Sequence, residues 1–146
     1  MTAKEYLSKI QIYRRAIMST QLRIEELGHQ AAGIRAITYD RDHVQVSPEN
    51  HMEKIMIRLA AQTEKMSRQI IKYQTEVAKR ERQIAEMDNP DHAEILRLRY
   101  MELDADGRPM SLEEIACTMH LSYFRVRHLH GEALAAFARR HKVSTH

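Results

Sequence analysis

The sequence is short of the residues that interrupt a polypeptide backbone. Its 146 residues include four glycines, three prolines and no tryptophan, and aromatic residues make up only 5%. Because Gly and Pro mark most turns, their scarcity favours long helices over a many-turned β fold. A hydrophobic content of 43% with 29% charged residues predicts an ordered chain of one or two small domains.

Cysteine and long apolar runs are also scarce. Cys117 is the single cysteine, so no disulfide forms within the chain, and the composition fits a reducing compartment. We expect Cys117 to be an inert buried thiol. The sequence contains no run of about 18 apolar residues, so we expect no membrane span. The start of the chain also has no apolar signal-peptide core. We therefore expect a cytoplasmic protein without membrane association.

Catalytic and cofactor-binding motifs are missing as well. The sequence has no phosphate-cradling glycine loop and no serine nucleophile elbow. Asp104 and Asp106 lie in a Gly/Pro loop, but the spacing of a calcium-binding EF-hand loop is absent. Cys117 and His120 stand three residues apart, yet no second Cys or paired His completes a zinc site. We predict no enzymatic activity, no cofactor and no metal.

Two long segments place apolar residues at the 3.5-residue spacing of a coiled-coil seam. The first begins at a capping-box pattern, Thr2 to Glu5, and predicts a helix over about residues 3–36. A polar connector, about residues 38–50, leads to a second predicted helix from about Pro48 to Met87. The two stripes consist of Tyr6, Ile10, Tyr13, Ile17, Thr20, Ile24, Leu27, Ala31 and Ile34, and of Met52, Met56, Leu59, Thr63, Met66, Ile70, Tyr73, Val77, Arg80, Ile84 and Met87.

Both stripes need a partner, since each apolar side chain left in water forgoes about 1.5–3 kcal/mol of burial. The two helices can fold back on each other as an antiparallel coiled-coil hairpin, which is the fold we expect for residues 1–88. The alternative partner is a second copy of the chain, which would give a homodimer through residues 3–87. The sequence alone does not decide between these pairings.

Residues 89–146 predict a second, all-helical domain. A turn around Pro90 leads to a helix over about residues 91–103, and residues 104–109 form a loop by composition. Basic residues gather near the end of the chain. Residues 1–106 contain 17 basic and 17 acidic residues, whereas residues 107–146 contain six basic and three acidic ones. The net charge of +3 therefore lies in the final segment, as in a polyanion-binding module.

Two capped helices follow each other closely in this segment. Ser111 and Glu114 form a capping-box pattern at the start of a helix that ends at about Met119. His120 and Leu121 make a turn, and Ser122 caps the next helix. A short capped helix, a tight turn and a second capped helix with a basic outer face are the pattern of a helix-turn-helix.

The stretch SLEEIACTMHLSYFRVRHLHGEALAAFARR, residues 111–140, resembles region 4 of sigma-70-type factors, where their DNA-reading helix-turn-helix lies. The similarity runs without gaps through the capped Leu-Glu-Glu-Ile start, the Leu-Ser turn into Arg-Val-Arg, and the Ala-Leu run of the last helix. The whole chain also resembles small phage and prophage late-gene regulators of the RinA or ArpU type. These often contain a Leu-His-Gly-x-Ala-Leu stretch such as residues 129–134.

The resemblance implies a sequence-specific transcription regulator of phage or prophage type that binds double-stranded DNA and works with host RNA polymerase. Such a protein would be associated with the nucleoid of a bacterial host cell. Amides at a helix N-terminus would meet phosphate, and the outer face of the second helix would enter the major groove. The implied DNA-binding residues are Ser111, Ser122, Tyr123, Phe124, Arg125, Arg127, His128, Arg139 and Arg140.

The sequence also departs from the sigma pattern. Region 4 usually has charged residues where Tyr123 and Phe124 stand, so we do not expect binding of the usual promoter element. This aromatic pair either contacts thymine methyl groups or packs into the protein, and the arginines either contact DNA or form a solvated helix face. The N-terminal half does not resemble the sigma regions that bind polymerase core or melt DNA, so a complete sigma factor is not expected.

Two other functions fit the same residues. A small terminase-like subunit of phage DNA packaging would also combine a helix-turn-helix with helical oligomerisation. A protein-only adaptor would use the sigma-like module to touch RNA polymerase without binding DNA. The sequence gives neither the target site, nor the sign of regulation, nor the oligomeric state.

Overall fold

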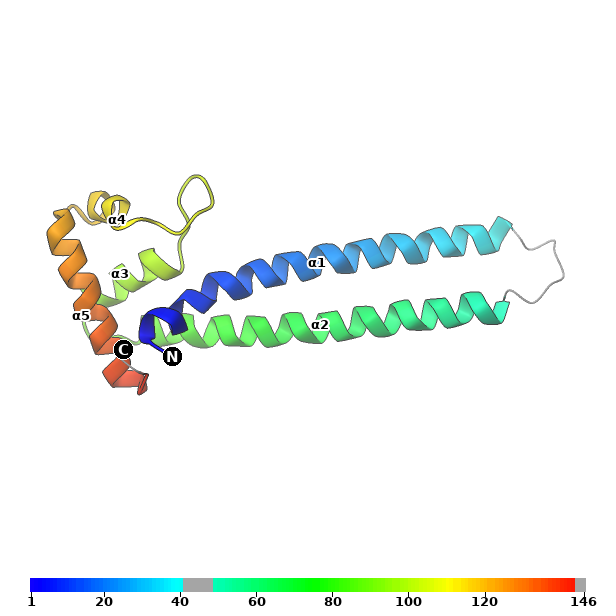
Figure 1. Cartoon of the computed structure of the whole chain (residues 1–146), viewed down its shortest axis with the longest axis horizontal. Helices are drawn as coiled ribbons and strands as arrows, with labels where there is room; N and C mark the ends of the chain where they lie inside the picture. Colours follow the sequence, from blue (N-terminus) through cyan, green and yellow to red (C-terminus); the bar gives the residue numbers. More distant parts are fainter. Residues whose placement is uncertain (41–48, 144–146) are drawn as a thin grey trace. The chain divides into compact units, whose positions relative to one another are not determined.

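The fold is all-α, as predicted. A computed structural model describes residues 1–40 and 49–143, and within these ranges it contains five helices and no strand (Figure 1). The helices are α1 (Ala3–Asp40), α2 (Glu49–Ala85), α3 (Pro90–Tyr100), α4 (Leu112–Met119) and α5 (Tyr123–His141). Most of the predicted connector, Pro48 included, lies outside the described residues. None of the described helices combines the length and apolar character that a membrane span requires.

The chain divides into two compact units, and the long helices run through both. One unit comprises residues 1–14 and 75–146, and the other comprises residues 15–74. In each unit α1 and α2 lie side by side and antiparallel, so they pair within a single chain (Figure 1). The predicted boundary between residues 88 and 89 separates two domains that would fold independently. It stays a prediction.

The unit of residues 15–74 is a helix pair with little buried surface. Ile70 is its one buried residue within the described part of the chain. Thr20 and Thr63, two polar positions of the stripes, donate their hydroxyls to carbonyls of their own helices, at 2.7 and 2.9 Å. An open cleft lined by residues of both helices, including Arg23 and Lys65, lies along this pair. A coiled coil here remains a prediction.

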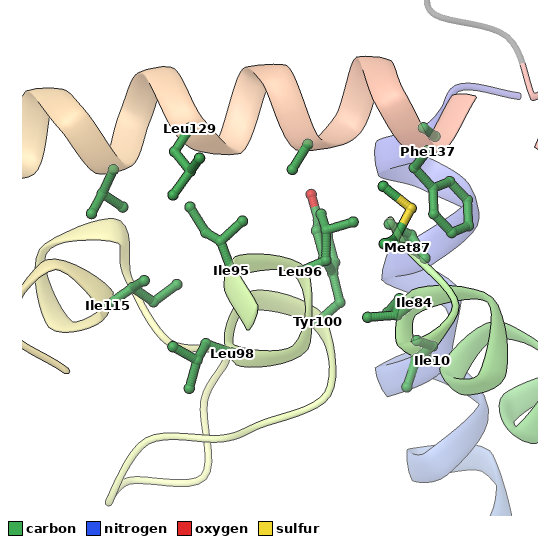
Figure 2. Packing of buried hydrophobic residues seen from close by; sticks show 14 of the residues in the cluster. Ile10, Ile84, Met87, Ile95, Leu96, Leu98, Tyr100, Ile115, Leu129 and Phe137 are labelled. Atoms are coloured by element: carbon green, nitrogen blue, oxygen red, sulfur yellow. The ribbon is translucent and has the colours of Figure 1, made fainter. Parts of the chain in front are cut away.

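The other unit has a hydrophobic core to which all five helices contribute (Figure 2). Its centre is made of side chains from the short helices, such as Ile95 and Phe137, together with Ile10 near the start of α1 and Ile84 near the end of α2. The buried set is Ala3, Leu7, Ile10, Val77, Ile84, Met87, Ile95, Leu96, Leu98, Tyr100, Ile115, Ala116, Val126, Leu129, Ala133, Phe137 and Ala138. The ends of the long helices therefore complete the core of the C-terminal helices.

Polar contacts join α1 to the end of α3. Gln11 Nε2 donates to the carbonyl of Tyr100 at 3.1 Å, and the Arg14 guanidinium donates to the carbonyl of Met101 and to Glu81. The last carbonyls of a helix have no partner within the helix itself. Side chains of α1 thus satisfy carbonyls at the C-terminal end of α3.

Arg80, a polar exception in the second stripe, is buried at 3% exposure. Its guanidinium lies 4.1 Å from the Tyr6 ring centroid, as in a cation–π contact, and its Nε donates to the Tyr6 carbonyl at 2.9 Å. Its Nη1 donates to the Glu76 carboxylate at 2.7 Å, and this hydrogen bond lowers the pKa of Glu76. A buried charge needs such partners, so Arg80 fixes how α1 and α2 meet at this level.

Tyr100 and His130 join α3 to α5. The Tyr100 hydroxyl lies 2.9 Å from His130 Nε2, and the two rings stack with centroids 5.8 Å apart. Burial, helped by Arg99, lowers the pKa of His130 to about 4, and burial raises the pKa of Tyr100 to about 12. Helix α3 ends at Tyr100, three residues before the predicted end.

We predict that Ile10→Ala lowers the free energy of unfolding by about 2–5 kcal/mol, because it leaves a cavity in a core that holds α5. The side chain of Ile10 is fully buried. Leu22→Ala is the matched control on the same helix, since Leu22 is 64% exposed, and its effect should stay within about 0.5 kcal/mol. Urea unfolding with hydrogen exchange tests both variants. Unchanged exchange protection of α5 amides in Ile10→Ala would contradict the shared core.

We predict that stability falls as pH decreases from about 6.5 towards about 4. In this range the unfolded chain binds a proton at His130 that the folded chain does not bind, so acid favours unfolding. The contribution is fully present above the unfolded pKa of about 6.5 and amounts to about 3 kcal/mol, since one pKa unit corresponds to about 1.4 kcal/mol. Thermal unfolding of wild type and of His130→Gln across this pH range measures it. Parallel pH profiles for the two proteins would show that His130 does not contribute.

Candidate nucleic-acid interface

Helix α4 begins at the predicted capping box. Ser111 Oγ accepts from the backbone N–H of Glu114 at 3.2 Å, and the Glu114 carboxylate accepts from the N–H of Ser111 at 3.2 Å. The reciprocal pair satisfies two amides that a helix start leaves open. Ile115 and Ala116 are buried on the inner side of α4. The local sequence therefore fixes both the start and the inward face of this helix.

The turn between α4 and α5 is tight. His120 adopts a left-handed conformation with φ of 56°, in which histidine is several-fold enriched over other non-glycine residues. The N–H groups of His120 and Leu121 donate to the carbonyls of Cys117 and Ala116, at 3.3 and 3.0 Å, and so close the end of α4. Ser122 Oγ then accepts from the N–H of Arg125 at 3.2 Å and starts α5.

Helix α5 has one buried and one exposed side. Val126, Leu129, Ala133 and Phe137 are buried against the other helices. Because an α-helix has 3.6 residues per turn, residues between these positions face the opposite way. Those on the exposed side in the first turns, here called the outer face, are Tyr123, Phe124, Arg127, His128 and Gly131.

The aromatic pair belongs to the outer face. Phe124 is 78% exposed and Tyr123 is 38% exposed, and their rings meet edge to face at 5.8 Å. The alternative that these two side chains pack into the core is therefore wrong. The inner side of α5 is already filled by aliphatic residues and Phe137, which leaves the aromatic pair in solvent.

Positive charge is unpaired at the start of α5. The side chains of Arg125 and Arg127 are exposed and make no ion pair or hydrogen bond within the described ranges. The first turn of α5 contains no acidic residue. A helix N-terminus also has a partial positive charge. The start of α5 is therefore electropositive.

Glu132 limits this positive charge. Its carboxylate lies 2.8 Å from His128 Nε2 and 3.8 Å from His92 Nε2, so one ring nitrogen of His128 is already engaged. Gly131, one turn beyond Arg127, has open space where a side chain would project. Sequence reasoning missed Gly131 and Glu132, although their i+4 spacing from Arg127 and His128 was a sufficient signal.

The remaining predicted site residues lie apart from the outer face. Arg139 and Arg140 stand in the last turn of α5, about 18 Å along the helix from Arg127. Arg140 Nη1 is 2.8 Å from Asp88 Oδ1 in an exposed ion pair. Ser111 lies at the start of the other helix, where Glu113 and Glu114 place negative charge in the first turn.

The expectation for Cys117 is corrected by the structure. Its thiol is exposed on α4 rather than buried, because Ile115 and Ala116 occupy the inward positions of this short helix. In the part of the chain that the structure describes, no group of three or more His, Cys, Asp or Glu side chains gathers as a metal site would.

Comparison with known proteins adds a family to this geometry. Searches of curated proteins and of solved structures found no match. Residues 89–137, about a third of the chain, match the family model of sigma-70 region 4, a family of DNA-binding domains. The match covers α3, α4 and α5 as far as Phe137. The chain therefore contains a helix-turn-helix like that of sigma-70 region 4.

Proposed function

We propose that this protein is a sequence-specific transcription regulator that binds duplex DNA with the outer face of α5 in the major groove. One observation carries the proposal: in the segment that matches sigma-70 region 4, α5 leaves Phe124, Arg127 and His128 exposed rather than packed. A recognition helix needs such a side, since base edges are read by side chains that reach out of the protein.

The dimensions of the outer face suit a groove. An α-helix with its side chains is about 10–12 Å across, and the major groove is about 12 Å wide, so α5 can enter it with the outer face towards the bases. Because Gly131 has no side chain and open space before it, this end of the face offers no bulk to hold a phosphate backbone away. The outer face can therefore lie close to DNA along its whole length.

Each residue at the start of α5 has a distinct proposed role. Arg127 pairs its guanidinium with guanine O6 and N7, the commonest specific contact. Arg125, which lies beside the outer face, contacts a phosphate. The Ser122 hydroxyl and the first amides of α5 approach a second phosphate, where the partial positive charge of the helix start attracts an anion.

The other proposed residues depend on rearrangement or flanking contacts. His128 keeps one ring nitrogen for a base or a phosphate while the other stays near Glu132. Arg139 and Arg140 serve as flanking phosphate contacts, and Arg140 must first leave Asp88. A phosphate contact at Ser111 is opposed by electrostatic repulsion, because the first turn of α4 is acidic.

The biological setting is proposed from the resemblance to RinA- or ArpU-like regulators. In that setting the protein acts in the bacterial cytoplasm, associated with the nucleoid, at phage or prophage promoters with host RNA polymerase. A homodimer through residues 3–87 is supported by the exposure of Met18, Leu22, Ile57 and Ile71 on the helix pair, each above 60%. A dimer would place two α5 helices about 34 Å apart, or a multiple of that distance.

The molecular mass in solution separates this function from its rivals. A monomer or dimer supports regulation, whereas a ring of eight or more copies supports DNA packaging by a small terminase-like subunit. Selection of bound fragments from genomic DNA at physiological salt tests the regulator directly. Failure to enrich any fragment, together with co-purification of RNA polymerase, would indicate the protein-only adaptor.

We predict that Arg127→Ala weakens binding to the selected site by about 1–3 kcal/mol and relaxes the preference at one base pair. Arg58→Ala is the matched control, because it removes the same charge from an exposed position on α2 outside the helix-turn-helix. Fluorescence anisotropy on the selected duplex and on its single-base variants measures both effects. An equal loss on every sequence would show that Arg127 does not read a base.

We predict that binding falls steeply with added salt, because neutralised phosphates release condensed counterions. Arg125→Ala should weaken binding similarly on all sequences and reduce the slope of log K against log salt by about one. Titrations at four or more salt concentrations give this slope for wild type and variant. A slope near zero for the wild type would contradict a phosphate-based footprint.

A further inference from the structure

An apolar patch stands at the start of α5, made of Leu121, Tyr123 and Phe124. Phe124 is 78% exposed, more than any other large hydrophobic side chain in the described ranges, and Leu121 and Tyr123 are each 38% exposed. The Tyr123 and Phe124 rings meet in a T-shaped arrangement, with their centroids 5.8 Å apart. Tyr123 therefore supports Phe124 from one side, while most of the Phe124 surface remains in water.

The surroundings of this patch are cationic. Phe124 stands three residues before Arg127 and four before His128, so all three share the outer face. Arg125 is adjacent, and the first turn of α5 has no acidic residue. A patch of this kind fits a polyanion that also displays apolar groups, and it does not fit a basic-rimmed or wholly apolar surface. Duplex DNA meets this requirement in the major groove, where thymine displays a C5-methyl group.

We propose that Phe124, supported by Tyr123, reads thymine C5-methyl groups and so makes thymine a preferred base of the target site. This inference rests on the proposed function, because it needs α5 in the major groove. It goes further because it names the base that Phe124 and Tyr123 recognise. These two residues stand where sigma region 4 usually has charged side chains. Only apolar contact distinguishes the base here, since a phenyl ring neither donates nor accepts a conventional hydrogen bond.

The geometry also places the thymine relative to the base read by Arg127. Three residues along a helix correspond to about 4.5 Å, and successive base pairs are about 3.4 Å apart. The methyl group that Phe124 contacts therefore lies within two base pairs of the guanine paired with Arg127. The selected site should contain a guanine with a thymine one or two positions away, on either strand.

Replacing single thymines by deoxyuridine tests the proposal, because uracil keeps every hydrogen-bonding group of thymine and lacks only the methyl. The duplex is the one enriched by selection, and anisotropy titrations at fixed salt give the dissociation constants. We expect wild type to lose about three- to fivefold in affinity at one or two positions, the effect of losing burial of one methyl-sized group. Deoxyuridine elsewhere in the site should have no effect.

Phe124→Ala should bind the thymine duplex about as weakly as wild type binds the deoxyuridine duplex, with no further loss on substitution. Tyr123→Phe is the matched control, because it keeps the supporting ring and should retain the deoxyuridine discrimination. Since Phe124 is exposed, the alanine variant should keep the wild-type melting temperature, which circular dichroism verifies before binding is measured.

Three outcomes would overturn the inference while leaving DNA binding intact. Wild type could bind every deoxyuridine duplex as tightly as the thymine duplex. Phe124→Ala could lose as much affinity as wild type on substitution, which would assign the methyl to another residue. Phe124→Ala could also keep full DNA affinity and lose only co-purification of RNA polymerase, which would make the patch a protein-docking surface. If wild type binds no duplex at physiological salt, the proposed function fails first.

Discussion

Burial of one side of α5 is the constraint on which the functional surface depends. Val126, Leu129 and Phe137 insert into a core formed with the other helices, and each such side chain contributes about 1.5–3 kcal/mol by leaving water. Once these positions are fixed inward, helical geometry leaves Phe124 and Arg127 no orientation except outward. The packing that stabilises the domain therefore also leaves the outer face of α5 exposed to solvent.

The C-terminal helices do not form their core alone. Ile10 from α1 and Ile84 from α2 are buried among them, Arg14 holds carbonyls at the end of α3, and Arg80 is buried where α1 and α2 meet. The sigma-like segment is thus attached to the long helices by a shared core and by hydrogen bonds. Any DNA-bound position of α5 must be compatible with these contacts, or must break them at a cost of several kcal/mol.

The rest of the helix pair has a different character. Between residues 15 and 74 the stripes are only partly covered, an open cleft lies along the pair, and Met18 and Leu22 project into water. This segment therefore leaves apolar surface in water, which a second copy would cover. The two proposed roles therefore use different surfaces of one chain: the outer face of α5 for DNA, and the helix pair for a second copy.

The sequence by itself determined the five helices to within a few residues at their ends, the capping box at Ser111, the turn before Ser122 and the inward residues of α5, because caps and periodicity act over one or two turns. Tertiary structure decided the pairing of the two stripes within one chain, the exposure of Phe124, the ion pair of Arg140 and the exposed thiol of Cys117. These features depend on which distant residues compete for the same buried space. A local sequence pattern indicates that a side chain must be buried or paired. Which residues bury it or pair with it is determined only by the tertiary packing.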